Sequence, residues 1–183
     1  KALTPRVSVL IPARNEVRKI EEGLASVLSQ DYPNLEIIVL DDRADDGTGD
    51  ILSRMKSRHP GLKVLRISEL PAGWIGKNYA LSCGTGRATG DLLLFTDADV
   101  VMNTSTVRKA VGYLLENRLD HLTLTPDIRI PASHSQSWWV CLAFCLACLS
   151  NPGRSRIPEA VGSWESGRSI WYKKRLIRRW EPI

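Results

Sequence analysis

The sequence predicts an α/β protein built on a doubly wound, mainly parallel sheet with helices on both faces. Two observations support this prediction: short aliphatic or β-branched runs alternate with amphipathic segments, and polar residues follow several of those runs directly. Strands that alternate with helices are typical of βαβ units, whose sheet is covered on both faces. A chain of 183 residues, 43% of them hydrophobic, is long enough for one such domain.

The first strand is expected over 7–11, where an apolar, β-branched run lies between two prolines. A helix is expected over 17–30, because apolar residues recur there at spacings of three and four. A second buried strand is expected over 36–40. The helix expected over 48–58 ends before the Pro60-Gly61 pair, which is a typical stop signal.

The rest of the chain continues the alternation of strands and helices. Strands are expected over 63–67, 91–95 and 122–125, and helices over 78–88 and 104–117. A segment with two glycines, Gly73 and Gly76, precedes the first of these helices. Consecutive parallel strands linked by helices bring their carboxyl ends to one edge of the sheet, where ligands bind in folds of this class.

Polar residues stand at that edge after three of the predicted strands. They are the segment Pro12-Ala13-Arg14-Asn15-Glu16, the pair Asp41-Asp42, and the aspartates Asp97 and Asp99. Residues spaced by two lie on the same side of an extended chain, so the carboxylates of Asp97 and Asp99 can face one point. Such a pair suits Mg²⁺ or Mn²⁺ bridging the protein to substrate phosphates. The alternative is a solvated acidic strand end that binds nothing.

The other polar residues suggest a nucleotide site. Asp42 can accept a hydrogen bond from the imide N–H of uracil, or it can instead cap the following loop. Lys77 can place a positive charge beside a diphosphate, or it can be an ordinary exposed lysine. Arg14 and Glu16 can line the base pocket or form an ion pair with each other.

Charge and hydropathy suggest where the protein works. The net charge of +5 and the isoelectric point of 9.2 indicate an anionic partner. Basic residues are concentrated after residue 151, which fits contact with anionic lipid headgroups or a solvated basic face. The apolar run over 138–149 is too short to span a bilayer and fits either a core helix or a membrane interface. The four cysteines form no disulfide pattern, which suggests a reducing, cytosol-facing environment.

Four segments in order resemble motifs of the family-2 glycosyltransferases. Residues 7–16 resemble the opening strand with its PxxNE motif, and residues 41–48 resemble the DDxSxDGT loop, with Ala44 in place of the usual serine. Residues 73–81 are similar to the GWxGKxxAL of members that act on lipid acceptors, and residues 88–99 to AxGDxLLFxDAD. Residues 166–175 resemble an acceptor-site segment of ceramide glucosyltransferase-like and hopanoid-associated members.

The resemblance implies a GT-A fold and an inverting transfer of a sugar from a nucleoside diphosphate sugar, most often a UDP-sugar, to a lipid acceptor. It implies no nucleic-acid partner and a place at the cytoplasmic face of a membrane. Asp99 then corresponds to the principal metal ligand and Asp97 to the aspartate beside it, with Mg²⁺ or Mn²⁺ as the cofactor. The nucleotide-sugar site is expected to comprise Pro12, Ala13, Arg14, Glu16, Asp42, Lys77 and Asp97.

The same resemblance places the catalytic base beyond Ile183, so no catalytic residue is assigned and the chain resembles a truncated form. Residues 1–150 are expected to form the nucleotide-sugar-binding core, and 151–183 an incomplete, basic, acceptor-side segment of the same domain. One alternative is a nucleotide-sugar-binding module without transfer activity. A sugar nucleotidyltransferase is less favoured, because no glycine follows the first strand directly.

Overall fold

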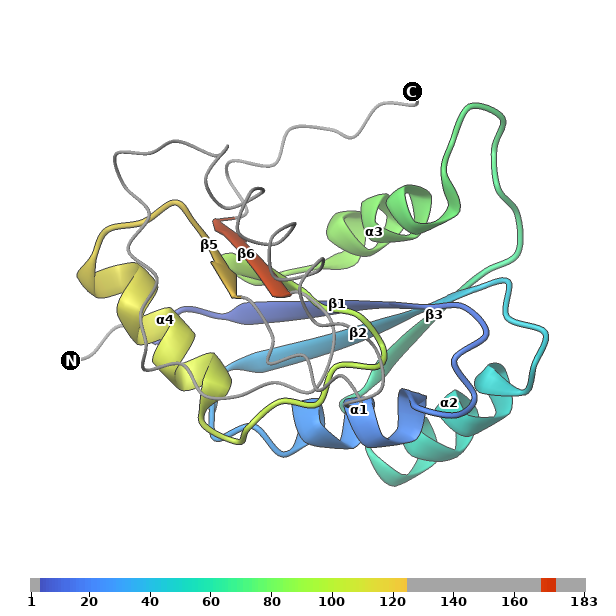
Figure 1. The fold of residues 1–183 in the computed structure, drawn as a ribbon, viewed down its shortest axis with the longest axis horizontal. Coiled ribbons are helices and arrows are strands. Elements are labelled where there is room, and N and C mark those ends of the chain that lie inside the picture. The colour runs from blue at the N-terminus through green and yellow to red at the C-terminus, as the bar shows by residue number, and fades with distance from the viewer. Residues whose placement is uncertain (1–3, 125–168, 174–183) are drawn as a thin grey trace, which may run out of the picture.

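The computed structural model describes residues 4–124 and 169–173 of the chain. Ten elements lie in the described part, and their order along the chain is that of an α/β protein (Figure 1). They are β1 (Val7–Ala13), α1 (Ile20–Leu28), β2 (Leu35–Asp42), α2 (Thr48–Arg58), β3 (Lys63–Ile67), α3 (Gly76–Arg87), β4 (Leu92–Phe95), α4 (Thr106–Glu116), β5 (His121–Leu124) and β6 (Ser169–Lys173).

The strands form one sheet in the order β3-β2-β1-β4-β6-β5. The neighbours β3, β2, β1 and β4 run parallel to one another, whereas β6 runs antiparallel to both β4 and β5. The carboxyl ends of β1, β2 and β3 point toward the right of Figure 1, between α3 above and α1 and α2 below. The predicted α/β class, with a mainly parallel sheet, is therefore confirmed.

The sheet separates two apolar layers, because side chains alternate between the faces of a strand. Val9 and Ile11 of β1 belong to the layer shared with α1, α2 and α4. Leu10 of the same strand belongs to the opposite layer, which contains Ala80 and Leu81 of α3. All three residues of β1 are at most 2% exposed. Helices thus cover both faces, as the sequence predicted.

Two strands extend further toward their carboxyl ends than the sequence predicted. β1 continues through Pro12 to Ala13, and β2 continues to Asp42. A proline is tolerated in β1 because the ladder with β4 ends at Leu10, so Pro12 has only β2 as a neighbour. α1 starts three residues later than predicted, at Ile20. The predicted site residues Pro12, Ala13 and Asp42 therefore belong to strands.

The fifth predicted strand does not pair with the fourth. Strand β6 lies between β4 and β5, with Leu93 opposite Tyr172 and Leu122 opposite Trp171. Residues 169–173 belong to the basic acceptor-side segment expected over 151–183, for which no strand was predicted. The run Ile170-Trp171-Tyr172 has high β propensity and carried the missed signal. The apolar run over 138–149 lies outside the described residues.

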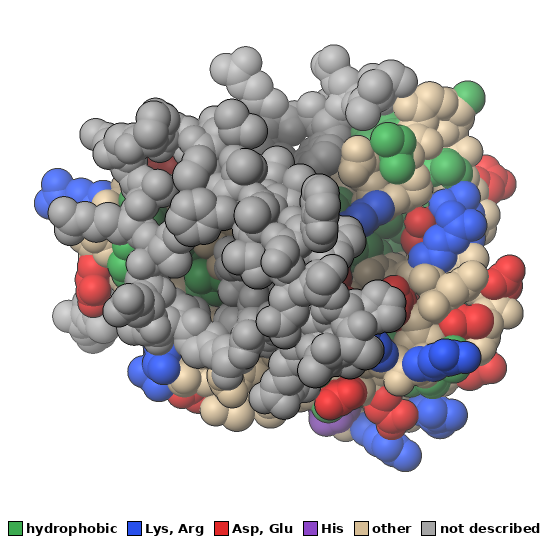
Figure 2. Space-filling view, viewed as in Figure 1, with side chains coloured by type: hydrophobic (Ala, Val, Ile, Leu, Met, Phe, Trp, Pro, Cys, Tyr) green, Lys and Arg blue, Asp and Glu red, His purple; other side chains and the backbone are tan. Residues whose placement is uncertain are grey.

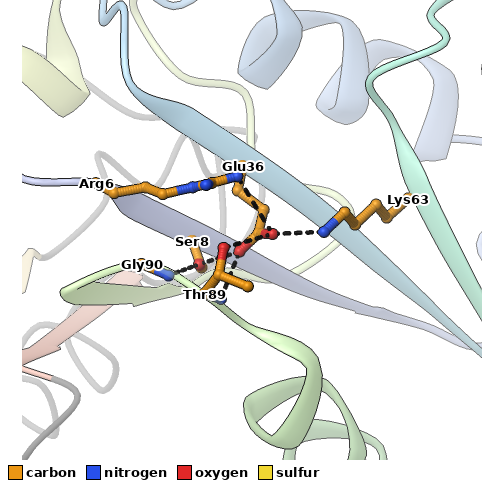
Figure 3. A network of polar contacts seen from close by, with 6 residues as sticks. All are labelled: Arg6, Ser8, Glu36, Lys63, Thr89 and Gly90. Carbon is orange, nitrogen blue, oxygen red and sulfur yellow. Dashed lines mark hydrogen bonds and ion pairs between the residues drawn. The ribbon is translucent and has the colours of Figure 1, made fainter.

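A buried carboxylate joins three strands and the α3–β4 turn at the amino ends of the parallel strands (Figure 3). Glu36 of β2, whose side chain is 1% exposed, accepts hydrogen bonds from Ser8 of β1, from Lys63 of β3 at 2.6 Å, and from the N–H of Thr89 at 2.8 Å. These bonds outweigh the opposing effect of burial and lower the pKa of Glu36 from 4.5 to about 2. The Gly90 N–H in turn donates to Ser8.

Among the helices described, none combines enough length and apolar character to cross a bilayer.

Candidate donor-binding site

Residues from three separate segments meet at the carboxyl edge of the sheet. Gly76, the first residue of α3, lies against the side chains that follow β1 and β2. A methyl group built on Gly76 would lie 2.7 Å from Nη2 of Arg43, 2.9 Å from Oδ2 of Asp42 and 3.8 Å from Nη1 of Arg14. On this side of the molecule, acidic and basic side chains lie intermixed (Figure 2). A side chain at position 76 would therefore have to displace the side chains of Asp42 and Arg43.

Asp42 forms a two-pronged ion pair with the residue that follows it. Nε of Arg43 donates to Oδ1 at 2.8 Å and Nη2 donates to Oδ2 at 3.2 Å. This hydrogen bonding raises the pKa of Arg43. The side chain of Asp42 is 4% exposed. Capping of the following loop, the alternative role considered for Asp42, falls instead to Asp41, whose Oδ1 accepts from the N–H of Ala44 at 3.4 Å.

The two aspartates that follow β4 each lie near a lysine. Nζ of Lys77 lies 2.5 Å from Oδ1 of Asp97, and Nζ of Lys19 lies 3.8 Å from Oδ2 of Asp99. Lys77 comes from the first turn of α3 and Lys19 from the turn before α1. Both lysine side chains are more than half exposed, so these ion pairs are easily exchanged for other partners.

The loop that carries these aspartates rests on α1. The carbonyl oxygen of Ala98 approaches Gly23 so closely that a side chain at position 23 would collide with it. Gly23 itself is buried in α1. The position of Asp97 and Asp99 is thus fixed by helix packing as well as by the end of β4.

Glu16 is influenced by both aspartates. Partial burial raises its pKa first, and the nearby charges of Asp99 and Asp97 raise it further, while Lys19 acts in the opposite direction. Within the described residues Glu16 forms no ion pair with Arg14, because Arg14 lies toward Gly76. The structure therefore does not support the pairing of Arg14 with Glu16, and it places Glu16 in the electrostatic field of the aspartates.

Three hydrogen bonds tie the loop after β1 to the loop after β2 and to the first residue of α2. The N–H of Glu16 donates to Oγ1 of Thr48 at 2.9 Å, and the N–H of Val17 donates to Oδ2 of Asp46 at 3.0 Å. The N–H of Asp45 donates to Oδ1 of Asn15 at 3.1 Å. The two polar motifs that were singled out separately in the sequence thus form one connected wall.

The two carboxylates that follow β4 are ligands of the type that suits a divalent cation shared with a substrate. Among the described residues no group of three or more His, Cys, Asp or Glu side chains could hold a metal ion. Mg²⁺ is commonly held by one or two carboxylates and completes its coordination with waters and substrate phosphates. Asp97 and Asp99, which lie near the charge of Glu16, provide two carboxylates of this kind.

A separate hollow of about 390 Å³ lies on the other side of β2, between α2 and β3. Asp41, Gly49 and Arg66 are among its lining residues, and none of the sequence-predicted site residues lines it. Asp41 and Asp42 alternate in direction along β2, so Asp41 faces this hollow while Asp42 faces α3. The hollow is therefore distinct from the Asp42–Gly76 contact.

Two basic residues of the site, Arg43 and Lys19, were not predicted from the sequence. Arg43 follows Asp42 directly in the sequence. Because adjacent side chains of a strand normally point to opposite faces, no contact between them was expected. Lys19 was counted within a predicted helix, where its proximity to Asp99 could not be seen. The structure places Pro12 and Ala13 at the end of β1, next to the other predicted residues.

Comparison with known proteins identifies the family. Residues 8–141 match the sequence model of glycosyl transferase family 2, which is well over half of the chain. The chain belongs to glycosyl transferase family 2. A relative from Staphylococcus haemolyticus, the 4,4'-diaponeurosporenoate glycosyltransferase, is 39% identical over 110 residues, which cover 59% of this chain and 28% of that protein.

Two solved structures of glycosyltransferases share the fold of this family-2 chain. The mannosyltransferase PcManGT from Pyrobaculum calidifontis, solved with GDP-Man and Mn²⁺, is 33% identical with a TM-score of 0.61, over 68% of this chain and 36% of that one. Staphylococcus aureus TarS 1–349, solved with UDP-GlcNAc, is 29% identical with a TM-score of 0.59, over 72% and 37% of the two chains. The expected GT-A fold is thereby confirmed.

The family-2 chain spans roughly a third of the length of these three proteins, between 28% and 37%. Both solved neighbours hold a nucleotide sugar, one with a uridine and one with a guanosine nucleotide. A divalent cation accompanies the nucleotide sugar in one of them. These findings agree with the donor class that the sequence predicted.

Proposed function

We propose that this chain carries the donor-binding part of an inverting glycosyltransferase, which transfers a hexose from a UDP-sugar to a lipid acceptor. The observation that carries the proposal is the convergence of Asp42, Gly76, Lys77 and Asp97 at the carboxyl edge of the sheet. Family membership favours sugar transfer over the nucleotidyl transfer considered as an alternative.

Each residue has a role in donor binding that follows from its position. Asp42 accepts a hydrogen bond from the uracil N–H, with Arg14 and the Pro12–Ala13 strand end forming the neighbouring wall. Lys77 contributes a positive charge to the diphosphate, and its exposed ammonium group is free to leave Asp97. Glu16 adds negative charge near Asp97 and Asp99 and so favours a bound cation over bulk solvent.

Asp97 and Asp99 would hold Mg²⁺ or Mn²⁺ together with the donor phosphates. When bound, such an ion neutralises the charge that develops on the departing diphosphate. In an inverting transfer, a carboxylate base takes the proton of the acceptor hydroxyl, and the alkoxide attacks the anomeric carbon from the face opposite the diphosphate. No residue among 4–124 and 169–173 is assigned as that base.

The acceptor class is proposed from the sequence around α3. Residues 73–81 carry the GWxGKxxAL pattern of members that act on lipids, and Ile75 within it exposes 59% of its surface directly before Gly76. A lipid acceptor places the enzyme at the cytoplasmic face of a membrane, with the basic segment after residue 151 near anionic headgroups. Flotation with vesicles of neutral or anionic lipid tests that placement. We expect the protein to float with the anionic vesicles and not with the neutral ones.

Ligand-induced stabilisation tests the donor and metal assignments together. A ligand that binds only the folded state at 100 times its Kd adds about 2.7 kcal/mol of stability, which raises the Tm of a domain of this size by about 5–10 °C. We expect a rise of this order with UDP plus Mn²⁺ and a smaller one with UDP alone. In Asp99→Asn, the increment due to Mn²⁺ should disappear.

The matched control is Asp91→Asn, which removes a carboxylate at the opposite end of β4, where Asp91 accepts the N–H of Arg6 at 3.1 Å. This variant should keep the full Mn²⁺ increment. If Asp99→Asn also keeps it, the metal assignment is wrong, and if UDP raises the Tm of no form of the chain, the proposed function is wrong.

A further inference from the structure

Arg43 adopts a backbone conformation that turns its side chain back onto its neighbour. Adjacent residues of a strand point to opposite faces, so Asp42 and Arg43 would not meet if β2 simply continued. Arg43 has a φ of 54°, in the left-handed region that residues with a Cβ rarely adopt, and its N–H donates to the carbonyl of Ile67 at 3.2 Å. Strained residues of this kind cluster at functional sites, which directs attention to the Asp42–Arg43 pair.

The pair presents two kinds of hydrogen-bonding group side by side. The carboxylate of Asp42 is 4% exposed and is held in place by the guanidinium fork, whereas the side chain of Arg43 is 23% exposed. A guanidinium has five N–H donors, and the fork uses two of them. Gly76 packs against one side of the pair, since a methyl group at this position would lie 2.7 Å from Nη2 of Arg43 and 2.9 Å from Oδ2 of Asp42.

We infer that Arg43 selects the nucleotide base, so that the Asp42–Arg43 pair, rather than Asp42 alone, distinguishes a uridine from a guanosine donor. This inference rests on the proposed function, in which Asp42 faces the base. Uracil offers one N–H donor between two carbonyl acceptors. A carboxylate oxygen beside a guanidinium N–H matches the N–H and either carbonyl, in both orientations of the ring.

Guanine fits the pair less well and fits a bare carboxylate better. Its edge carries two adjacent N–H donors, which match the two oxygens of a free carboxylate, as in other carboxylate contacts with paired donors. The fork of Arg43 uses one lone pair on each oxygen of Asp42, on the side where paired donors would bind. It therefore competes with guanine but leaves a second lone pair for a single N–H. Removing the guanidinium removes a hydrogen-bond donor that uracil would use and makes both carboxylate oxygens available to guanine. The affinities for UDP and GDP are therefore expected to change in opposite directions.

Isothermal titration of the full 183-residue chain with UDP and with GDP, both at fixed Mn²⁺, tests the inference. Arg43→Gly removes the side chain and accepts the left-handed backbone without strain. We expect the Kd for UDP to rise about tenfold, the order of one hydrogen bond to a charged group. The Kd for GDP should stay the same or fall. Arg43→Lys keeps the charge but not the fork, and should also lose the preference for UDP.

The matched control is Arg66→Ala, because Arg66 lies 4.0 Å from the neighbouring Asp41 on the other side of β2. It should keep the wild-type ratio of the two affinities. Equal weakening of UDP and GDP in Arg43→Gly, or a wild-type ratio in Arg43→Lys, would overturn the inference while Asp42-dependent binding of UDP still upholds the proposed function. A wild-type chain that binds neither nucleotide overturns both.

Discussion

Replacing Glu36 with glutamine should make the stability of the chain much less sensitive to acid. Glu36 accepts hydrogen bonds from Ser8, Lys63 and Thr89 and donates none in return. A glutamine of the same shape turns one acceptor oxygen into an NH₂ group that faces donors. The variant loses the charge and also leaves a buried polar mismatch, so its free energy of unfolding at neutral pH must fall.

The size and sign of the effect follow from the pKa of Glu36. A fall from 4.5 in the unfolded chain to about 2 in the folded one corresponds to about 3 kcal/mol. This is an upper value, because Lys63 is half exposed and its charge is screened. The folded pKa is the lower one, so this stability is fully present above about pH 4.5 and is lost as the pH falls toward 2.

Urea unfolding followed by circular dichroism between pH 2.5 and 7.5 measures this contribution. We expect Glu36→Gln to be less stable than the wild type by about 2–3 kcal/mol at pH 7 and the two curves to approach each other at the acid end. Glu21→Gln is the matched control, because Glu21 is 55% exposed and lies 3.8 Å from Arg54. Parallel curves for wild type and Glu36→Gln across the whole range would refute the assigned role of this carboxylate.

Three further substitutions test particular contacts. Gly90→Ala should cost about 1–3 kcal/mol in urea unfolding, because its methyl group would lie 2.7 Å from the backbone N of Ser8, whereas Gly86→Ala, which meets nothing within 4 Å, should not destabilise. Lys77→Met should bind Mn²⁺ alone more tightly, since Asp97 loses its competing cation, but should bind UDP with Mn²⁺ more weakly; changes of the same sign in both titrations would contradict its role. Gly76→Ala should weaken UDP about tenfold in calorimetry with little change in Tm, and unaltered affinity would show that this contact is not part of the site.

The sequence predicted the parallel half of the fold well, because its elements carry strong local signals. The β1 and β2 runs are short, aliphatic and followed by polar residues, and the helix positions follow from apolar spacing. Short βαβ connections account for the pairs β1–β2 and β2–β3, whereas β4 pairs with the distant β1. Strand β6 could not be predicted in this way, since its partner β4 is distant in the sequence and no short connection specifies the pairing.

The site was predicted in its composition but not in its contacts. The positions of Asp42, Asp97 and Asp99 follow from strand ends, which a sequence reveals. The partner of Asp42 depends on one backbone angle at Arg43, and the neighbour of Asp99 depends on where α1 begins. Such contacts arise from turns and helix starts, whose boundaries sequence patterns define least well.

The place of β6 also limits how the protein can be shortened. β6 lies between β4 and β5 and pairs with both, so residues 169–173 supply the sheet with a strand that the first 124 residues lack. A fragment ending at Leu124 would retain every proposed donor-binding residue, yet it would expose the unpaired backbone of a fully buried, apolar β4. Open edges of this kind recruit strands from other molecules. Solubility, rather than nucleotide recognition, is therefore the property that such a deletion would remove first.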